Sequence, residues 1–173
     1  MNLPQDEEGQ AWFLRQMLTD TGFFCRNVLG MDTDRDPNGN PIGEPGEGGV
    51  RDSGPHKELC AFLDDDSNKN SVIWAPRASY KSSIVLGFIL RKILAHPNIS
   101  ILMFMHETIM AKERCAKMRD ILTSNPIIKH FFGDVKGPKW TADSFTTSLR
   151  TDGTLQSPTL WVASPQKIGR AHV

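Results

Sequence analysis

Residues 71–83 read SVIWAPRASYKSS, and this stretch decides the fold class. Its first four residues form a short apolar run, and residues 75–81 follow as a loop. Residues 82–95 are mostly apolar and are expected to form a helix that ends before Pro97. The succession predicts a buried strand, a loop and a helix, which is the repeating unit of α/β folds.

The loop itself fits part of the phosphate-loop (P-loop) pattern GxxxxGK[ST]. Lys81 and Ser82 match its last two positions, whereas Ala75 and Tyr80 stand where the pattern has glycine. In such a loop the backbone N–H groups surround phosphates, the lysine faces the β- and γ-phosphates, and the hydroxyl is a ligand to Mg²⁺. The alternative is an ordinary strand-to-helix loop with a solvated lysine and a serine cap. Tyr80 argues for the alternative, because its side chain has to point away from a nucleotide and its Cβ restricts the backbone.

The rest of the chain extends this pattern in both directions. Residues 10–30 predict a helix with one apolar stripe, which Asp20–Gly22 interrupts, and a further helix is expected at 56–63 with His56 partly exposed at its start. Alternating strands and helices then predict a parallel sheet flanked by helices. The expected strands are 99–105, 145–149 and 159–163, and the expected helix is 109–122, stopped by Asn125-Pro126.

The predicted elements divide the chain into four parts. They are a helical segment at 1–36, a loop at 37–55, an incomplete P-loop ATPase domain at 56–166 and a tail at 167–173. In the loop, ten of nineteen residues are Gly or Pro, which opposes both helix and strand. Residues 168–173, IGRAHV, resemble a translated sequencing adapter, so we expect the authentic sequence to end near Gln166.

Charge and composition narrow the class of protein. The chain has 20 Lys+Arg and 20 Asp+Glu, but residues 1–66 carry fourteen acidic and five basic residues and the remainder six and fifteen. We therefore expect phosphate to be bound in the second half. The three cysteines are too few for a disulfide framework, and Arg91 interrupts the most apolar run. We expect no signal peptide, because the first ten residues are acidic where a signal peptide would be basic. These features predict a soluble, intracellular protein.

Several of these motifs, in the same order, are similar to phage large terminase subunits. The stretch VIWAPRASYKSSIVLGFILRKI resembles their deviant Walker A region, and the likeness continues through residues 99–134 and 139–164. The resemblance implies an ATP-driven DNA-packaging motor, with an N-terminal P-loop ATPase of the ASCE type followed by an RNase H-like nuclease. It also implies the partners: double-stranded phage DNA, a small terminase subunit and a portal protein on which the motor oligomerises, all in the host cytoplasm.

The resemblance further implies roles for single residues. Arg77 and Lys81 are the catalytic candidates, because Arg77 would sense or stabilise the γ-phosphate and Lys81 would bind it. Ser82 would coordinate Mg²⁺. Tyr80 departs from the family pattern. The residues implied to bind ATP are Pro76, Arg77, Ala78, Ser79, Tyr80, Lys81, Ser82 and Ser83.

The family's Walker B element, an apolar strand that ends in acidic residues, does not occur in this sequence. We therefore expect little ATP turnover by this chain. Two other functions stay open. One is another P-loop enzyme, such as a helicase-like ATPase or a small-molecule kinase. The other is a non-catalytic phage accessory module whose loop binds DNA phosphate or a partner protein. The basic residues of the 109–122 helix are expected to be solvated, with DNA contact as the alternative.

Overall fold

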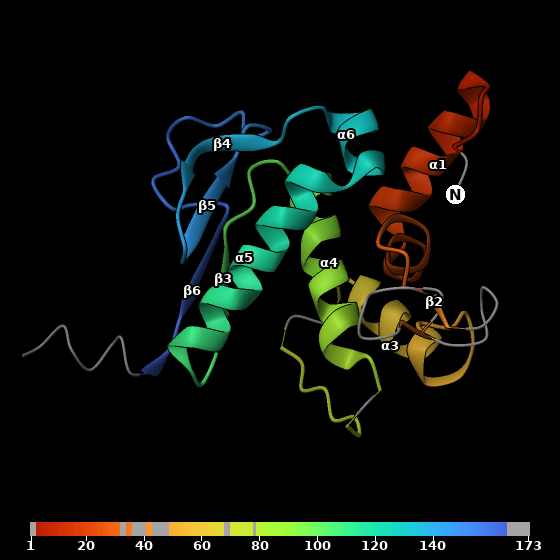
Figure 1. Cartoon of the computed structure of the whole chain (residues 1–173), viewed down its shortest axis with the longest axis horizontal. Helices are drawn as coiled ribbons and strands as arrows, with labels where there is room; N and C mark the ends of the chain where they lie inside the picture. Colours follow the sequence, from red (N-terminus) through yellow and green to blue (C-terminus); the bar gives the residue numbers. More distant parts are fainter. Residues whose placement is uncertain are drawn as a thin grey trace, which may run out of the picture. The chain divides into compact units, whose positions relative to one another are not determined.

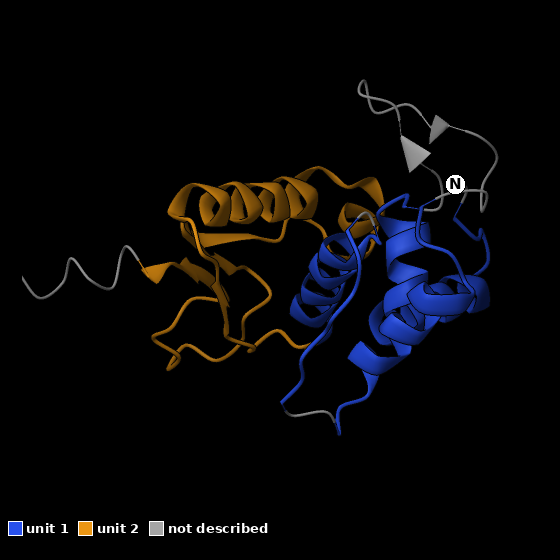
Figure 2. Cartoon of the chain, turned by 90° about the horizontal axis from the view of Figure 1, so that it is seen from below, with its two compact units in different colours: residues 1–95 blue, residues 96–173 orange. Residues whose placement is uncertain are grey.

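The chain divides into two compact units, Met1–Ala95 and His96–Val173 (Figure 2). The structure, a computed structural model, describes residues 3–31, 49–67, 70–77 and 79–165, and the backbone alone at 34–35 and 41–42. The predicted ATPase segment, 56–166, extends over both units, and its assignment as one domain stays a prediction. The predicted tail and Ala78 lie outside the described residues.

The first unit is built mainly from helices (Figure 1). The side chain of Asp6 caps the first helix by accepting a hydrogen bond from the Gly9 N–H at 3.1 Å. Asp20 ends that helix and caps the next by accepting from the Phe23 N–H at 2.8 Å, so the predicted interruption is confirmed. The helices are α1 (Glu7–Thr19), α2 (Thr21–Phe23), the π-helix η1 (Phe24–Val28), α3 (Gly54–Asp64) and α4 (Lys81–Ala95).

The predicted Gly/Pro-rich loop contains more regular structure than its composition indicates. A short antiparallel pair, β1 (Asp34–Arg35) and β2 (Pro41–Ile42), begins before it and ends inside it. At its other end, α3 already starts at Gly54, because Pro55 has the fixed φ that suits the first turn of a helix. The expectation that 37–55 excludes helix and strand is therefore wrong at both places.

A buried polar network joins the four α-helices of this unit. Arg91 is only 4% exposed, although it lies on a helix that is mostly apolar. Its guanidinium donates to the Thr21 hydroxyl at 3.0 Å, to the Leu18 carbonyl at 2.6 Å and to the Asp64 carboxylate at 2.6 Å. Thr21 also donates to that carboxylate through its N–H and its hydroxyl. Since these residues come from α1, α2, α3 and α4, one charged group fixes all four helices.

The strand predicted at residues 71–74 is not formed. Residues 71–76 have no regular structure, and the Val72 and Trp74 side chains are 91% and 97% exposed. A strand needs a neighbour that accepts and donates its backbone hydrogen bonds. The two described strands of this unit, β1 and β2, pair with each other and provide no such neighbour. The apolar run alone was therefore an insufficient signal.

The second unit is a four-stranded sheet with α5 packed against it (Figure 1). The strand order is β3-β6-β5-β4, in which β3 and β6 are parallel and the other neighbours antiparallel. This confirms an α/β fold and corrects the predicted parallel sheet to a mixed one, because the tight turn at Thr141–Asp143 can join β4 to β5 only in antiparallel sense. The strands are β3 (Ile101–Phe104), β4 (Lys136–Trp140), β5 (Ser144–Thr147) and β6 (Leu160–Ala163).

The helices of the second unit follow from local signals. In α5 (Thr108–Ser124) the buried residues are Ala111, Cys115, Met118 and Leu122, the stripe that their spacing predicts. Asn125 ends this helix and caps α6 (Pro126–Phe132), because its side chain accepts from the N–H groups of Ile127 and Ile128. No helix in the described ranges is both long enough and apolar enough to span a membrane.

Candidate phosphate site at the start of helix α4

Helix α4 begins at the residue that the motif places at the end of the phosphate loop. The first bond of the helix runs from the Ile84 N–H to the Tyr80 carbonyl, at 2.9 Å. The N–H groups of residues 81–83 precede that bond and have no carbonyl of the helix to donate to. The first turn contains no acidic residue, so nothing in it offsets the positive end of the helix dipole. A helix end of this kind favours an anion.

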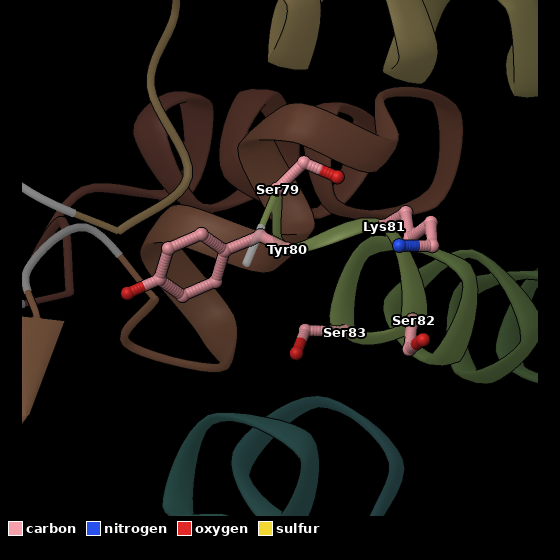
Figure 3. A pocket seen from close by; sticks show the side chains of 5 residues that line it. All are labelled: Ser79, Tyr80, Lys81, Ser82 and Ser83. Carbon is pink, nitrogen blue, oxygen red and sulfur yellow. The ribbon is translucent and has the colours of Figure 1, made fainter. Parts of the chain in front are cut away.

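Tyr80, which stands at the position of the motif's second glycine, has a left-handed backbone conformation. Its φ is +54°, and it is the one non-glycine residue within the described ranges with a positive φ. For an L-residue with a Cβ this conformation costs about 1–2 kcal/mol. The ring points away from the Lys81 amine (Figure 3). The loop therefore has a left-handed backbone at the position of the motif's second glycine, and the ring is directed away from the lysine that follows it.

The Lys81 amine is folded back over its own loop. It donates to the Pro76 carbonyl at 2.7 Å, and the Ser79 hydroxyl donates to the same oxygen at 2.8 Å. The Pro76 carbonyl oxygen thus accepts two hydrogen bonds, one of them from a charged amine. An anion bound at the helix end would therefore compete with Pro76 for this amine.

The structure brings five of the predicted site residues together. Ser79, Tyr80, Lys81, Ser82 and Ser83 line one surface hollow of about 330 Å³ (Figure 3). Two other predicted residues, Pro76 and Arg77, come earlier in the loop and do not line this hollow. The Pro76 carbonyl accepts the hydrogen bond from the Lys81 amine, and the Arg77 side chain is exposed. Ser82 is exposed and its hydroxyl is available to a ligand. The described residues contain no group of three or more His, Cys, Asp or Glu side chains that could hold a metal.

A second hollow, which the sequence did not predict, adjoins the first. It measures about 570 Å³ and shares Ser79 with the first hollow. Its walls come from one side of α3 and from the exposed segment before the loop. Most of the side chains that line it are apolar, among them Leu59, Phe62, Val72, Ile73 and Trp74. No periodicity signals this pocket, because it forms between segments that lie about ten residues apart or more in the chain.

Comparison of the chain with family models, with curated proteins and with solved structures gave no match. The class of the protein therefore rests on its residues and their geometry.

Proposed function

We propose that this chain is the N-terminal ATPase part of a phage large terminase and that residues 76–83 bind the triphosphate of ATP. The observation that supports this most directly is the left-handed backbone at Tyr80. The loop matches only two of the motif's four fixed positions. At the position of the second glycine, however, Tyr80 has a positive φ, which is a conformation that glycine favours and other residues rarely adopt. The order of the further motifs along the sequence supports the same class.

In this proposal each loop residue has its own role. Lys81 exchanges its contact with the Pro76 carbonyl for the β- and γ-phosphates. The N–H groups of residues 81–83 bind phosphate oxygens at the positive end of α4. Arg77, exposed in the loop, stabilises charge on the γ-phosphate, and the Ser82 hydroxyl would be a ligand to Mg²⁺, which neutralises phosphate charge when bound. The apolar hollow beside Ser79 suits the base.

The same proposal includes the partners and the setting. The protein would act on double-stranded phage DNA together with a small terminase subunit and a portal protein, as a homo-oligomer in the host cytoplasm. The proposed partners and setting depend on the series of sequence motifs that resembles large terminases. A helicase-like ATPase would share the phosphate loop, and a non-catalytic module would use the same loop for DNA phosphate.

The test is binding of Mg-ATP by calorimetry to the wild type and to Lys81→Ala. Loss of a charge-assisted hydrogen bond predicts an affinity at least tenfold weaker. Lys92→Ala is the matched control, since Lys92 lies in the last turn of α4, away from the loop, and forms an ion pair with Asp66. Equal affinities of wild type and Lys81→Ala would contradict the proposal. DNA binding that weakens with salt and ignores ATP would assign the loop to the accessory module instead.

A further inference from the structure

Tyr80 holds a strained backbone at the entrance of the helix, and the surroundings of its ring explain why the strain persists. Strained conformations survive where the neighbouring structure determines them. The ring packs against the apolar cluster of the first unit, formed by Cys25, Val50, Cys60 and Ile84. The Tyr80 ring is therefore held by the core, whereas the backbone of the same residue belongs to the loop.

The ring has a second anchor on α3. It meets the His56 ring edge to face, with the centroids 5.8 Å apart and the planes at 83°. His56 is itself held, because its Nδ1 accepts a hydrogen bond from the Arg51 N–H at 3.1 Å. Tyr80 is thus fixed from two sides, by the core and by a side chain that the backbone orients.

Glycine at this position would make the loop path free of strain and at the same time release the loop from both anchors. Tyrosine has the opposite effect: its backbone is strained at this φ, but the contacts of its ring restrict the motion of the loop. A loop that is ordered before binding loses less conformational entropy when the ligand arrives.

We propose that Tyr80 is a positioning residue that preforms the phosphate loop. Through its contacts with the core cluster and His56 it holds residues 76–77 and 79–83 in the conformation that receives phosphate, before any ligand binds. The inference rests on the proposed function, because it assigns this task within the triphosphate site. It also makes a claim about the ligand-free chain that is measured without ATP.

The first experiment compares Mg-ATP affinity among four chains, each with all 173 residues: the wild type, two variants of Tyr80 and a control variant. Tyr80→Phe keeps the ring and should bind within about threefold of the wild type, whereas Tyr80→Gly should bind about tenfold more weakly. Met17→Ala is the control for a general loss of stability, because Met17 is fully buried in the same unit but belongs neither to the cluster that contacts Tyr80 nor to the lining of the hollow at the start of α4. Equally weak binding by Met17→Ala, or full affinity of Tyr80→Gly, would overturn the inference.

The second experiment uses the fact that Tyr80 is the only tyrosine of the chain. Labelling with 3-fluorotyrosine gives one fluorine NMR signal that reports this ring. In the ligand-free chain we expect it to lie away from its position in urea, to shift in His56→Ala, and to move little when Mg-ATP is added. A signal at the unfolded position that moves only with ligand would show that the loop is ordered by binding, and would overturn the inference.

The two experiments separate the two proposals. If the wild type binds no Mg-ATP, the proposed function fails. The fluorine signal is measured without ATP, so it still decides by itself whether the Tyr80 ring is held in place in the ligand-free chain: an ordered signal supports that part of the inference, and a signal at the unfolded position overturns it.

Discussion

Two buried thiols in the first unit show how strongly burial acts on single residues. Burial raises the pKa of the Cys25 thiol to about 12, with the nearby Cys60 adding to the effect. Burial likewise raises the pKa of Cys60 to about 11. Both thiols belong to the apolar cluster that also contacts Tyr80. Their protonated form is the one that the folded chain accommodates, which favours a packing role over a reactive one.

These shifts predict a loss of stability at high pH. An unfolded thiol releases its proton near pH 9, whereas the folded chain keeps it to about pH 11 or 12, so the free energy of unfolding falls as pH rises through this window. The slope should approach about 1.4 kcal/mol per pH unit for each thiol. Urea unfolding at pH 8, 9, 10 and 11 measures it. Cys25→Ala should have a shallower slope, and an unchanged slope would contradict the assignment.

At the scale of elements, the pair β4 and β5 depends on one glycine. The backbones approach so closely at Gly137 that a Cβ there would lie 2.1 Å from the Thr146 carbonyl oxygen. The register between the two strands also shifts in this region, between Lys136 and Trp140. A side chain at 137 would therefore force the strands apart.

We predict that Gly137→Ala destabilises the chain by about 2 kcal/mol, in the range of substitutions that overfill a packed site. Gly153→Ala is the control, because a Cβ at Gly153 has no atom within 4 Å and the turn there is open. The control should change the free energy of unfolding by about 0.5 kcal/mol or less. Urea midpoints of the three chains provide the measurement. Equal losses in both variants would show that the close approach at Gly137 is unimportant.

At the scale of the whole molecule, each unit has a stabilising centre of its own. The contacts of Arg91 with Leu18, Thr21 and Asp64 all lie within Met1–Ala95. The hydrogen bonds that order the sheet lie within His96–Val173. A change in the Arg91 network should therefore act first on the helices of its own unit.

Asp64→Ala leaves Arg91 buried without its carboxylate and should cost about 3 kcal/mol. Asp66→Ala breaks the pair with Lys92 in which the carboxylate is 82% exposed, and should cost less than about 1 kcal/mol. Hydrogen exchange locates the effect. In Asp64→Ala, amide protection should fall in α1, α3 and α4 and stay unchanged in β5. Loss of protection throughout both units would show that they unfold as one.

The sequence alone determined those features that depend on neighbours within one or two helical turns. The buried stripe of α5, the interruption at Asp20 and the stop at Asn125 were all predicted from spacing and capping residues. The α/β class followed from the succession of such elements. The assignment of the loop before α4 as a phosphate loop stays a prediction, since Lys81 and Ser82 alone match the fixed positions of the motif.

Only the tertiary structure decided which segments find partners. The apolar run at 71–74 has no neighbouring strand among the described residues, whereas β4, with its glycine and proline, pairs along the sheet edge where Pro138 is tolerated. The burial of Arg91 depends on Leu18, 73 positions away, and Tyr80 keeps its left-handed backbone because a core assembled from distant residues holds its ring. Strand pairing, buried charge and strain depend on contacts between residues far apart in the chain, and local residue patterns do not contain that information.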